Sequence, residues 1–182
     1  MMSCRRQLAV FANPAAGRGR RALDKALAVL EARGVGYRVH APQTGEGLRQ
    51  AIRTLAADVE AIVIAGGDGT INQALPALQG SEAVLGILPL GTANDLARSL
   101  GIPDDPDAAA RVLVEGERTR MDLGCVNGRV FCNVAHIGLG AARPQRGSRA
   151  AGQAPAAFPG VSPERGTGDP AASAVYGGDH GG

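Results

Sequence analysis

The stretch that decides the fold is AIVIAGGDGT, residues 61–70. Its first five residues are apolar, as in a buried strand, and three glycines around the carboxylate of Asp68 follow directly. Open α/β sheets bind ligands beyond the carboxyl ends of their strands. Glycine leaves backbone amides uncovered there, and amides at the start of a helix attract phosphate. The stretch therefore predicts a cradle for a polyphosphate, with Asp68 suited to a network of Mg²⁺ and phosphate.

Strand and helix signals alternate on both sides of this stretch, up to about residue 115. Apolar runs predict strands at residues 8–12, 35–39, 61–65 and 84–88. Helices are expected around Leu23–Leu30, around Leu48–Leu55, at 71–79, between Asn94 and Gly101, and between Asp105 and Gly116. Repeated β–α units of this length predict an α/β fold with a doubly wound, mainly parallel sheet.

Polar residues at three of the expected helix starts are placed to act as N-caps. Thr44 precedes the second helix, and Asp105 followed by Pro106 precedes the last one. For the helix between residues 94 and 101, Thr92 and Asn94 are alternative caps.

A β-hairpin is expected after the last helix. Asn127-Gly128 is the strongest two-residue turn signal, and closing it pairs Val126 with Arg129. The same register places Asp122 opposite Asn133 on a polar face and leaves the other face apolar.

Composition limits the function classes. The net charge of +2 is too small to argue for nucleic acid as a partner. Three cysteines give no disulfide framework, which favours a reducing cytosol. The apolar run at 8–12 is too short for a signal peptide or a transmembrane segment, so any work at a membrane would be peripheral. Residues 141–182, rich in Ala, Gly and Pro, predict a disordered tail.

Three glycine-rich turns are expected at the same edge of the sheet. They are Asn13-Pro14-x-x-Gly17, residues 66–70, and PLGTAND at residues 89–95. Tight-turn chemistry explains any one of them as well as ligand binding does, but their convergence favours a binding site. None is a Walker A loop, because no Gly-Lys-Ser/Thr follows, and none matches the dinucleotide fingerprint.

In this order and spacing the three motifs resemble the diacylglycerol kinase catalytic domain family, above all its soluble bacterial lipid kinases. The stretch GTANDLAR, residues 91–98, carries the distinction, because GGDG alone is shared with NAD kinases and phosphofructokinases. Phe131, Asn133 and residues 137–140 extend the resemblance, which covers about residues 6–140.

The resemblance implies ATP and Mg²⁺ as cofactors, bound in a cleft. Asp68 would act catalytically, through water, on the Mg²⁺–ATP network. Asp122 matches a carboxylate that extends this network, although a solvated strand residue is an equal interpretation. The residues that would line the nucleotide are Asn13, Pro14, Gly17, Thr44, Gly66, Gly67, Asp68, Gly69, Thr70, Ile71, Asn72, Gly91, Thr92 and Asn94.

The resemblance also implies the domain organisation. Residues 1–126 would form the nucleotide-binding catalytic domain, and residues 127–140 the hairpin return and the start of a truncated second domain. In the family this second, β-rich domain closes the cleft, receives the lipid and supplies the carboxylate general base. Residues 141–182 have no matching residues, so the second domain is expected to be missing.

The function implied is transfer of the γ-phosphate of ATP to the hydroxyl of diacylglycerol or a related lipid, defective if the chain lacks the general base. A non-catalytic nucleotide-binding module and an NAD kinase-like phosphotransferase stay open as alternatives. The expected partners are a nucleotide and a lipid at the membrane surface, with oligomerisation left open. The expected location is the cytoplasm, peripheral at the inner membrane face.

Overall fold

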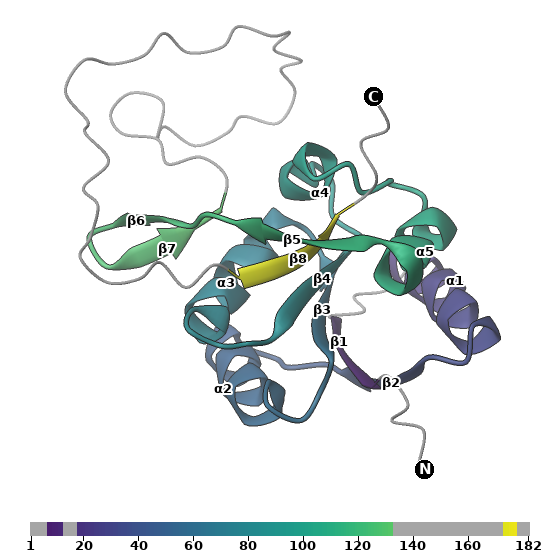
Figure 1. The fold of residues 1–182 in the computed structure, drawn as a ribbon, viewed down its shortest axis with the longest axis horizontal. Coiled ribbons are helices and arrows are strands. Elements are labelled where there is room, and N and C mark those ends of the chain that lie inside the picture. The colour runs from purple at the N-terminus through teal and green to yellow at the C-terminus, as the bar shows by residue number, and fades with distance from the viewer. Residues whose placement is uncertain (1–6, 13–17, 133–172, 178–182) are drawn as a thin grey trace, which may run out of the picture. The chain divides into compact units, whose positions relative to one another are not determined.

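The apolar runs form strands of one six-stranded sheet in the computed structural model (Figure 1). The structure describes residues 7–12, 18–132 and 173–177, all within one compact unit. The strands lie in the order β2-β1-β3-β4-β8-β5, and all neighbours are parallel except β8 and β5. Their bounds are β1 (Gln7–Ala12), β2 (Gly36–His40), β3 (Ala61–Gly66), β4 (Val84–Pro89), β5 (Glu117–Met121) and β8 (Ser173–Gly177).

Helices of the described residues cover both faces of this sheet (Figure 1). They are α1 (Arg18–Ala32), α2 (Gly45–Leu55), α3 (Asp68–Leu78), α4 (Asp95–Ser99) and α5 (Pro106–Glu115). Helix α1 contacts α5 and α2 contacts α3, which gives one helix pair on each face. The doubly wound, mainly parallel α/β fold predicted from the sequence is thus confirmed. Within the described part, no helix combines the length and the apolar character needed to cross a bilayer.

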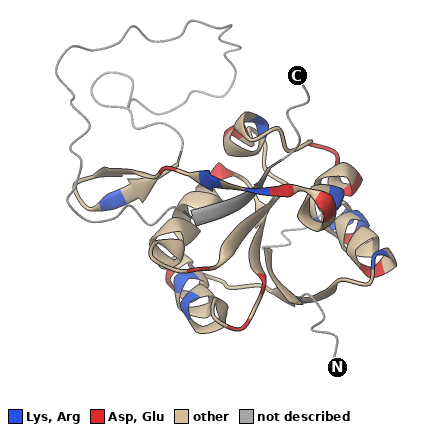
Figure 2. Ribbon diagram, viewed as in Figure 1, with Lys and Arg blue, Asp and Glu red and all other residues tan. Residues whose placement is uncertain are grey.

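The core of the sheet is apolar and uncharged. Every residue of β4 is buried, and β1, β3 and β4 carry no charged side chain (Figure 2). The carboxyl ends of these strands lie next to one another, because Ala12 pairs with Ala65 and Gly66 with Pro89. The segments that leave β3 and β4 therefore start side by side.

The glycine motif lies partly inside a helix rather than ahead of it. The sequence predicted a helix over 71–79, whereas α3 already begins at Asp68 and has Gly67 as its N-cap. The connection from strand to helix is thus the single extended residue Gly67, with φ −102° and ψ −177°. Pro76 lies in the last turn of α3, where it has no N–H to donate to the carbonyl of Asn72. The fold therefore delivers Asp68 on the first turn of a helix.

The hairpin register predicted from Asn127-Gly128 is confirmed, but the hairpin is shorter than expected. Strands β6 (Gly124–Val126) and β7 (Arg129–Phe131) pair Val126 with Arg129 and Gly124 with Phe131. The preceding strand, β5, pairs with β8 instead. Asn133, and with it the expected pairing to Asp122, lies outside the described residues.

Strand β8 departs from the expected disordered tail. It lies between β4 and β5, parallel to the first and antiparallel to the second. Both neighbouring strands offer backbone donors and acceptors to a strand inserted between them. Because this pairing involves residues far away in sequence, a local hydrophobic pattern in residues 173–177 is not needed to form the strand. Apart from residues 173–177, the segment 141–182 lies outside the described residues.

Candidate functional site

Two of the predicted glycine segments touch each other at the carboxyl edge of the sheet. We call them the GGDGT segment (residues 66–70) and the PLGTAND segment (residues 89–95). The backbone amide of Leu90 donates to the carbonyl of Gly66 at 3.1 Å. A Cβ added to Gly91 would lie 2.4 Å from the Cα of Gly67, closer than real Cβ atoms come. Glycine is therefore required where the two segments cross.

The side chain of Asn94 holds the PLGTAND segment in its bent shape. Asn94 is only 6% exposed and has left-handed backbone angles, φ 51° and ψ 43°. Its Oδ1 accepts from the Gly91 amide at 3.0 Å, and its Nδ2 donates to the carbonyls of Gly91 and Pro89 at 3.1 and 3.3 Å. A further contact of 3.4 Å joins Nδ2 to Oδ1 of Asp104. Asn94 thus acts on the conformation of the segment, and its predicted contact with a nucleotide stays a prediction.

The carboxylate of Asp68 connects the two segments a second time. Its Oδ2 accepts from the backbone amide of Asp95 and its Oδ1 from that of Leu96, both at 3.0 Å. These amides belong to the first turn of α4, where a helix has no acceptors of its own. The structure therefore places the carboxylate of Asp68 at the start of α4, although the two amides it accepts lie 27 and 28 residues further along the chain.

The first turns of α3 bring three more predicted residues to this edge. The side chain of Thr70 packs against Gly66, where an added Cβ would lie 3.0 Å from the Thr70 Oγ1. Ile71 is 1% exposed, so its side chain belongs to the core and only its backbone faces the site. The Sγ of Cys132, just beyond β7, donates to Oδ1 of Asn72 at 3.5 Å.

Burial raises the pKa of the Cys132 thiol from 9.0 to about 11, and the negative charge of Asp68 adds to the rise. The thiol is therefore neutral at physiological pH. The same shift indicates that the charge of Asp68 acts on the end of the hairpin as well as on α4.

A pocket of about 370 Å³ opens between the end of β1, the start of α2 and the first turns of α3. Thr44 stands at its rim and caps α2, because its Oγ1 accepts from the Gly47 amide at 3.0 Å. The side chain of Gln73 lies against Gly45, with its Oε1 2.8 Å from the position of an added Cβ. The lining residues are Phe11, Ala12, Pro42, Gln43, Thr44, Gly45, Leu48, Thr70 and Gln73.

Sequence reasoning found Thr44 and Thr70 in this pocket but missed the others. Phe11 is the fourth residue of an apolar run, and nothing in that run indicates a binding site. Gln73 lies one helical turn beyond Thr70, on the same side of α3. That spacing is the signal that could have identified it.

Four of the predicted residues are not shown to join the site. Asn13, Pro14 and Gly17 lie outside the described residues. Asp122 is exposed in the link between β5 and β6. Among the described residues, no group of three or more His, Cys, Asp or Glu side chains could hold a metal ion.

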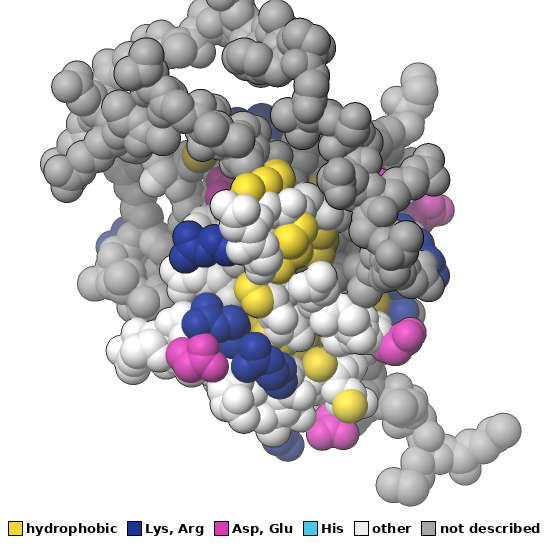
Figure 3. Space-filling model, turned by 90° about the vertical axis from the view of Figure 1, so that its left-hand side faces the viewer, with side chains coloured by type: hydrophobic (Ala, Val, Ile, Leu, Met, Phe, Trp, Pro, Cys, Tyr) yellow, Lys and Arg dark blue, Asp and Glu magenta, His cyan; other side chains and the backbone are white. Residues whose placement is uncertain are grey.

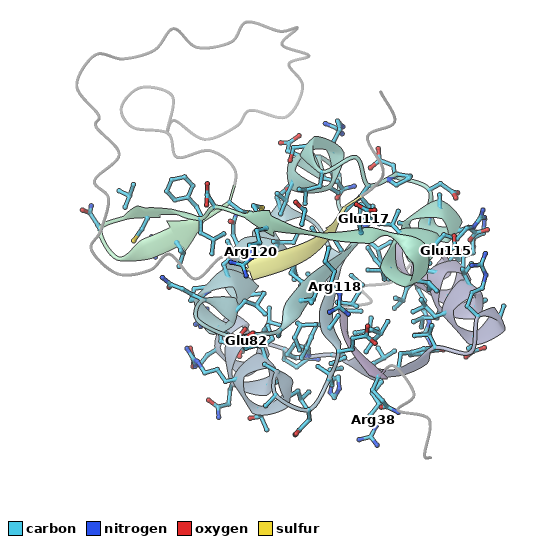
Figure 4. The ribbon with its side chains drawn as sticks, in the orientation of Figure 1. Arg38, Glu82, Glu115, Glu117, Arg118 and Arg120 are labelled. Atoms are coloured by element: carbon cyan, nitrogen blue, oxygen red, sulfur yellow. The ribbon has the colours of Figure 1, made fainter. Side chains whose placement is uncertain are left out.

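Several ion pairs join the described residues, and one of them, Arg98 with Asp95 at 3.1 Å, includes the last residue of the PLGTAND segment. On α2, Glu46 accepts from Arg49 at 2.6 Å, and this bond, with the nearby guanidinium charge, lowers the pKa of Glu46. Basic side chains stand beside acidic ones on this side of the molecule (Figure 3). On β5, Arg118, which Figure 4 labels, pairs with Glu60 at 2.6 Å.

Comparison with known proteins gives a consistent answer. The family model described as the diacylglycerol kinase catalytic domain matches residues 7–126. A diacylglycerol kinase of Staphylococcus saprophyticus is 35% identical over 136 residues, which are 72% of this chain and 45% of that protein. A diacylglycerol kinase of Staphylococcus epidermidis is 34% identical over 136 residues, which are 43% of that protein. The chain thus spans about half the length of the curated relatives it matches.

Solved structures agree. A crystal structure of a diacylglycerol kinase from Bacillus anthracis str. Sterne superposes with a TM-score of 0.63 at 25% identity. The superposition covers 71% of this chain and 46% of that one.

Proposed function

Because this chain belongs to the diacylglycerol kinase catalytic domain family, we propose that it binds Mg²⁺-ATP as the nucleotide-binding part of a lipid kinase. The family predicted from the three motifs is confirmed by the match over residues 7–126. The complete reaction would move the γ-phosphoryl group of ATP to a lipid hydroxyl, whose proton passes to a base. The observation that carries the proposal is the joining of the GGDGT and PLGTAND segments beside a pocket.

The joined segments suit a triphosphate. Phosphate binds well at helix starts because the first-turn amides lack intrahelical acceptors. Helix α3 begins such a turn at Asp68 and Gly69, directly after β3, whereas its Thr70 amide already donates to the carbonyl of Gly67 at 2.9 Å. Gly67 and Gly91 pack backbone against backbone, which brings the two segments together beside this turn. We assign the β- and γ-phosphates to this crossing.

The pocket suits the nucleoside. Its volume lies at the lower end of the range for small-molecule sites, and Phe11 and Leu48 provide apolar walls. Thr44, Gln43 and Gln73 provide polar groups at the same rim. Thr70 lines the pocket and belongs to the GGDGT segment, so one ligand can extend from the pocket to the crossing.

Magnesium would arrive on the triphosphate. Asp68 is the carboxylate that the GGDGT segment itself carries, and both of its oxygens already accept amides of α4. Mg²⁺ commonly keeps several waters and binds through one or two carboxylates and the substrate phosphates. Asp68 and Asp122 would then reach the ion through water, as the resemblance implies. Bound there, the metal would neutralise charge on the transferred group.

The lipid acceptor and the base are assigned to the second domain of the family. Phosphoryl transfer depends on positioning the acceptor and on stabilising charge. Residues 1–126 are thus proposed as the nucleotide-binding domain, and lipid would be met at the membrane surface. A second candidate is nucleotide binding without turnover, because the pocket and the two segments lie within residues 7–126 whereas the acceptor and base are assigned elsewhere.

Calorimetric titration with Mg²⁺-ATP tests the proposal. Gln73→Trp would fill the pocket and weaken binding roughly tenfold or more. Gln50→Trp, on the exposed side of α2 and outside the pocket lining, is the matched control and should bind as the parent does. Absent binding, or an equal effect of both substitutions, contradicts the proposal.

Labelled ATP and diacylglycerol vesicles separate the two candidates. Labelled phosphatidic acid that disappears with Gln73→Trp supports the kinase. Retained binding without product supports the binding module. Turnover of NAD without lipid turnover would instead support the NAD kinase-like alternative.

A further inference from the structure

We propose that Asp68 is a positioning residue that caps α4 from the neighbouring segment and thereby fixes the phosphate support. The inference deepens the proposed function and rests on it. It assigns to the carboxylate a contact with the protein's own backbone, whereas the sequence suggested a role towards the metal ion.

Helix α4 has no cap of its own. Its N-cap residue, Asn94, makes no side-chain hydrogen bond to the first turn of the helix. The Asn94 amide group turns back instead and bonds the Gly91 amide and the carbonyls of Gly91 and Pro89. The amides of Asp95 and Leu96 are therefore left for an acceptor from elsewhere.

Asp68 supplies that acceptor with both oxygens. The two hydrogen bonds are 3.0 Å long, and each oxygen takes one amide. Bonds from amides to a carboxylate are stronger than neutral ones, and a negative charge is favourable at a helix start. This compensation also explains how a carboxylate can stand beside a site proposed for phosphates.

The cap links the position of one segment to that of the other. Asp68 is the first residue of α3, and Asp95 directly follows the PLGTAND crossing and its bend. Loss of the cap would free α4 to move, and Gly91 and Thr92 would move with it. Affinity for the triphosphate should then fall whether or not a metal ion is bound.

The experiment compares Asp68→Ala and Asp68→Asn with Asp105→Ala. Asp105 caps α5 by accepting the Ala108 amide at 2.9 Å, so Asp105→Ala removes the same kind of contact from a helix that belongs to neither segment. Amide hydrogen exchange and ATP titrations with Mg²⁺ and with EDTA are measured well below the melting temperature of each variant.

The proposal predicts faster exchange of the Asp95 and Leu96 amides in Asp68→Ala. It also predicts a loss of ATP affinity of roughly tenfold without Mg²⁺, and any further loss with Mg²⁺ present measures the metal contact of the proposed function. Asp68→Asn keeps one acceptor and should fall between Asp68→Ala and the parent. Asp105→Ala should leave ATP affinity unchanged, although the first turn of α5 exchanges faster.

A loss confined to the Mg²⁺ titration would overturn the proposal in favour of a metal role. Unchanged exchange at Asp95 and Leu96 would overturn it as well. If Asp68→Ala does not fold, Asp68→Asn carries both readouts. A parent chain that binds no ATP contradicts the proposed function, whereas the exchange measurement still tests the cap.

Discussion

Helices α4 and α5 both begin under a carboxylate, but they obtain it in different ways. At α5, Asp105 immediately precedes the helix, accepts the Ala108 amide and is followed by Pro106 at the first helical position. At α4 the preceding residue turns its side chain away, and Asp68 reaches over from α3. The cap of α5 is local in sequence, and that of α4 exists only once β3 and β4 are paired.

The difference separates contacts that stabilise a single helix from contacts that hold two segments together. A local cap stabilises one helix, while a cap from another segment also fixes the distance between two segments. The crossing of Gly67 and Gly91 and the buried amide of Asn94 serve the same end. This combination is expected where backbone groups must be held ready for a ligand.

The largest expected effect comes from a side chain placed in the crossing. Gly91→Ala would put a Cβ against the backbone of Gly67 and 2.7 Å from Oδ1 of Asn94, so the segments must separate. We expect a loss of about 3 kcal/mol in the free energy of unfolding. Chemical denaturation measures it.

Gly69→Ala is the control for this substitution. An added Cβ there meets nothing within 4 Å, and Gly69 lies in α3. It should stabilise the protein by about 0.5–1 kcal/mol, opposite in sign to Gly91→Ala. Two changes of the same sign would break the comparison between a crossing and an open helical position.

Asn94→Ala should have the next largest effect. It leaves the Gly91 amide without its Oδ1 acceptor and puts alanine into a left-handed conformation. We expect a loss of about 2 kcal/mol by denaturation. Asn94→Gly relieves the backbone strain but not the lost hydrogen bonds, so it should recover part of the stability. If glycine restores all of it, the amide contacts do not hold the segment.

Loss of the local cap should cost less. Asp105→Ala removes one acceptor at α5, and we expect a loss of about 1 kcal/mol in unfolding free energy. Hydrogen exchange should rise only in the first turn of α5. Faster exchange in α4 as well would show that the two caps are coupled, which contradicts their separation here.

A further effect is confined to alkaline pH and sharpens the comparison from the side of Asp68. The pKa of Cys132 is raised to about 11 in the folded chain, while the unfolded thiol ionises near 9.0. Between these values the unfolded state has lost its proton and the folded state has not, so stability falls as pH rises from 9 towards 11.

Thiol modification measures this shift directly. In a Cys4→Ser background, Cys132 should react much more slowly at pH 9 than the exposed Cys125. Asp68→Asn should lower the pKa of Cys132, because it removes the nearby charge. An unchanged titration of Cys132 in that variant would contradict the contribution of Asp68.

Much of the fold could be predicted because its signals are local. Apolar runs located β1, β3 and β4, and the turn at Asn127-Gly128 set the hairpin register. Thr44 and Asp105 predicted the starts of their helices, because each side chain accepts from the backbone amide three residues ahead. These interactions join residues that the sequence already places together.

The rest depends on contacts between distant residues. Strand β8 forms between two strands that lie more than 50 residues before it in the chain, and its sequence alone shows no period. The bond of Asp68 to α4 and the approach of Gln73 to the end of β1 arise from the order of strands. Sequence reasoning selected Asp68 as a site residue but did not predict this partner.

The central claim is that the GGDGT and PLGTAND segments support the phosphates of one nucleotide together. The most direct test is a titration of the isotope-labelled chain with Mg²⁺-ATP, followed through its amide resonances. The account predicts that Gly67, Gly69, Thr70, Gly91 and Thr92 shift along one common binding curve. Resonances that stay still at saturating nucleotide, or shifts confined to one of the two segments, would contradict it.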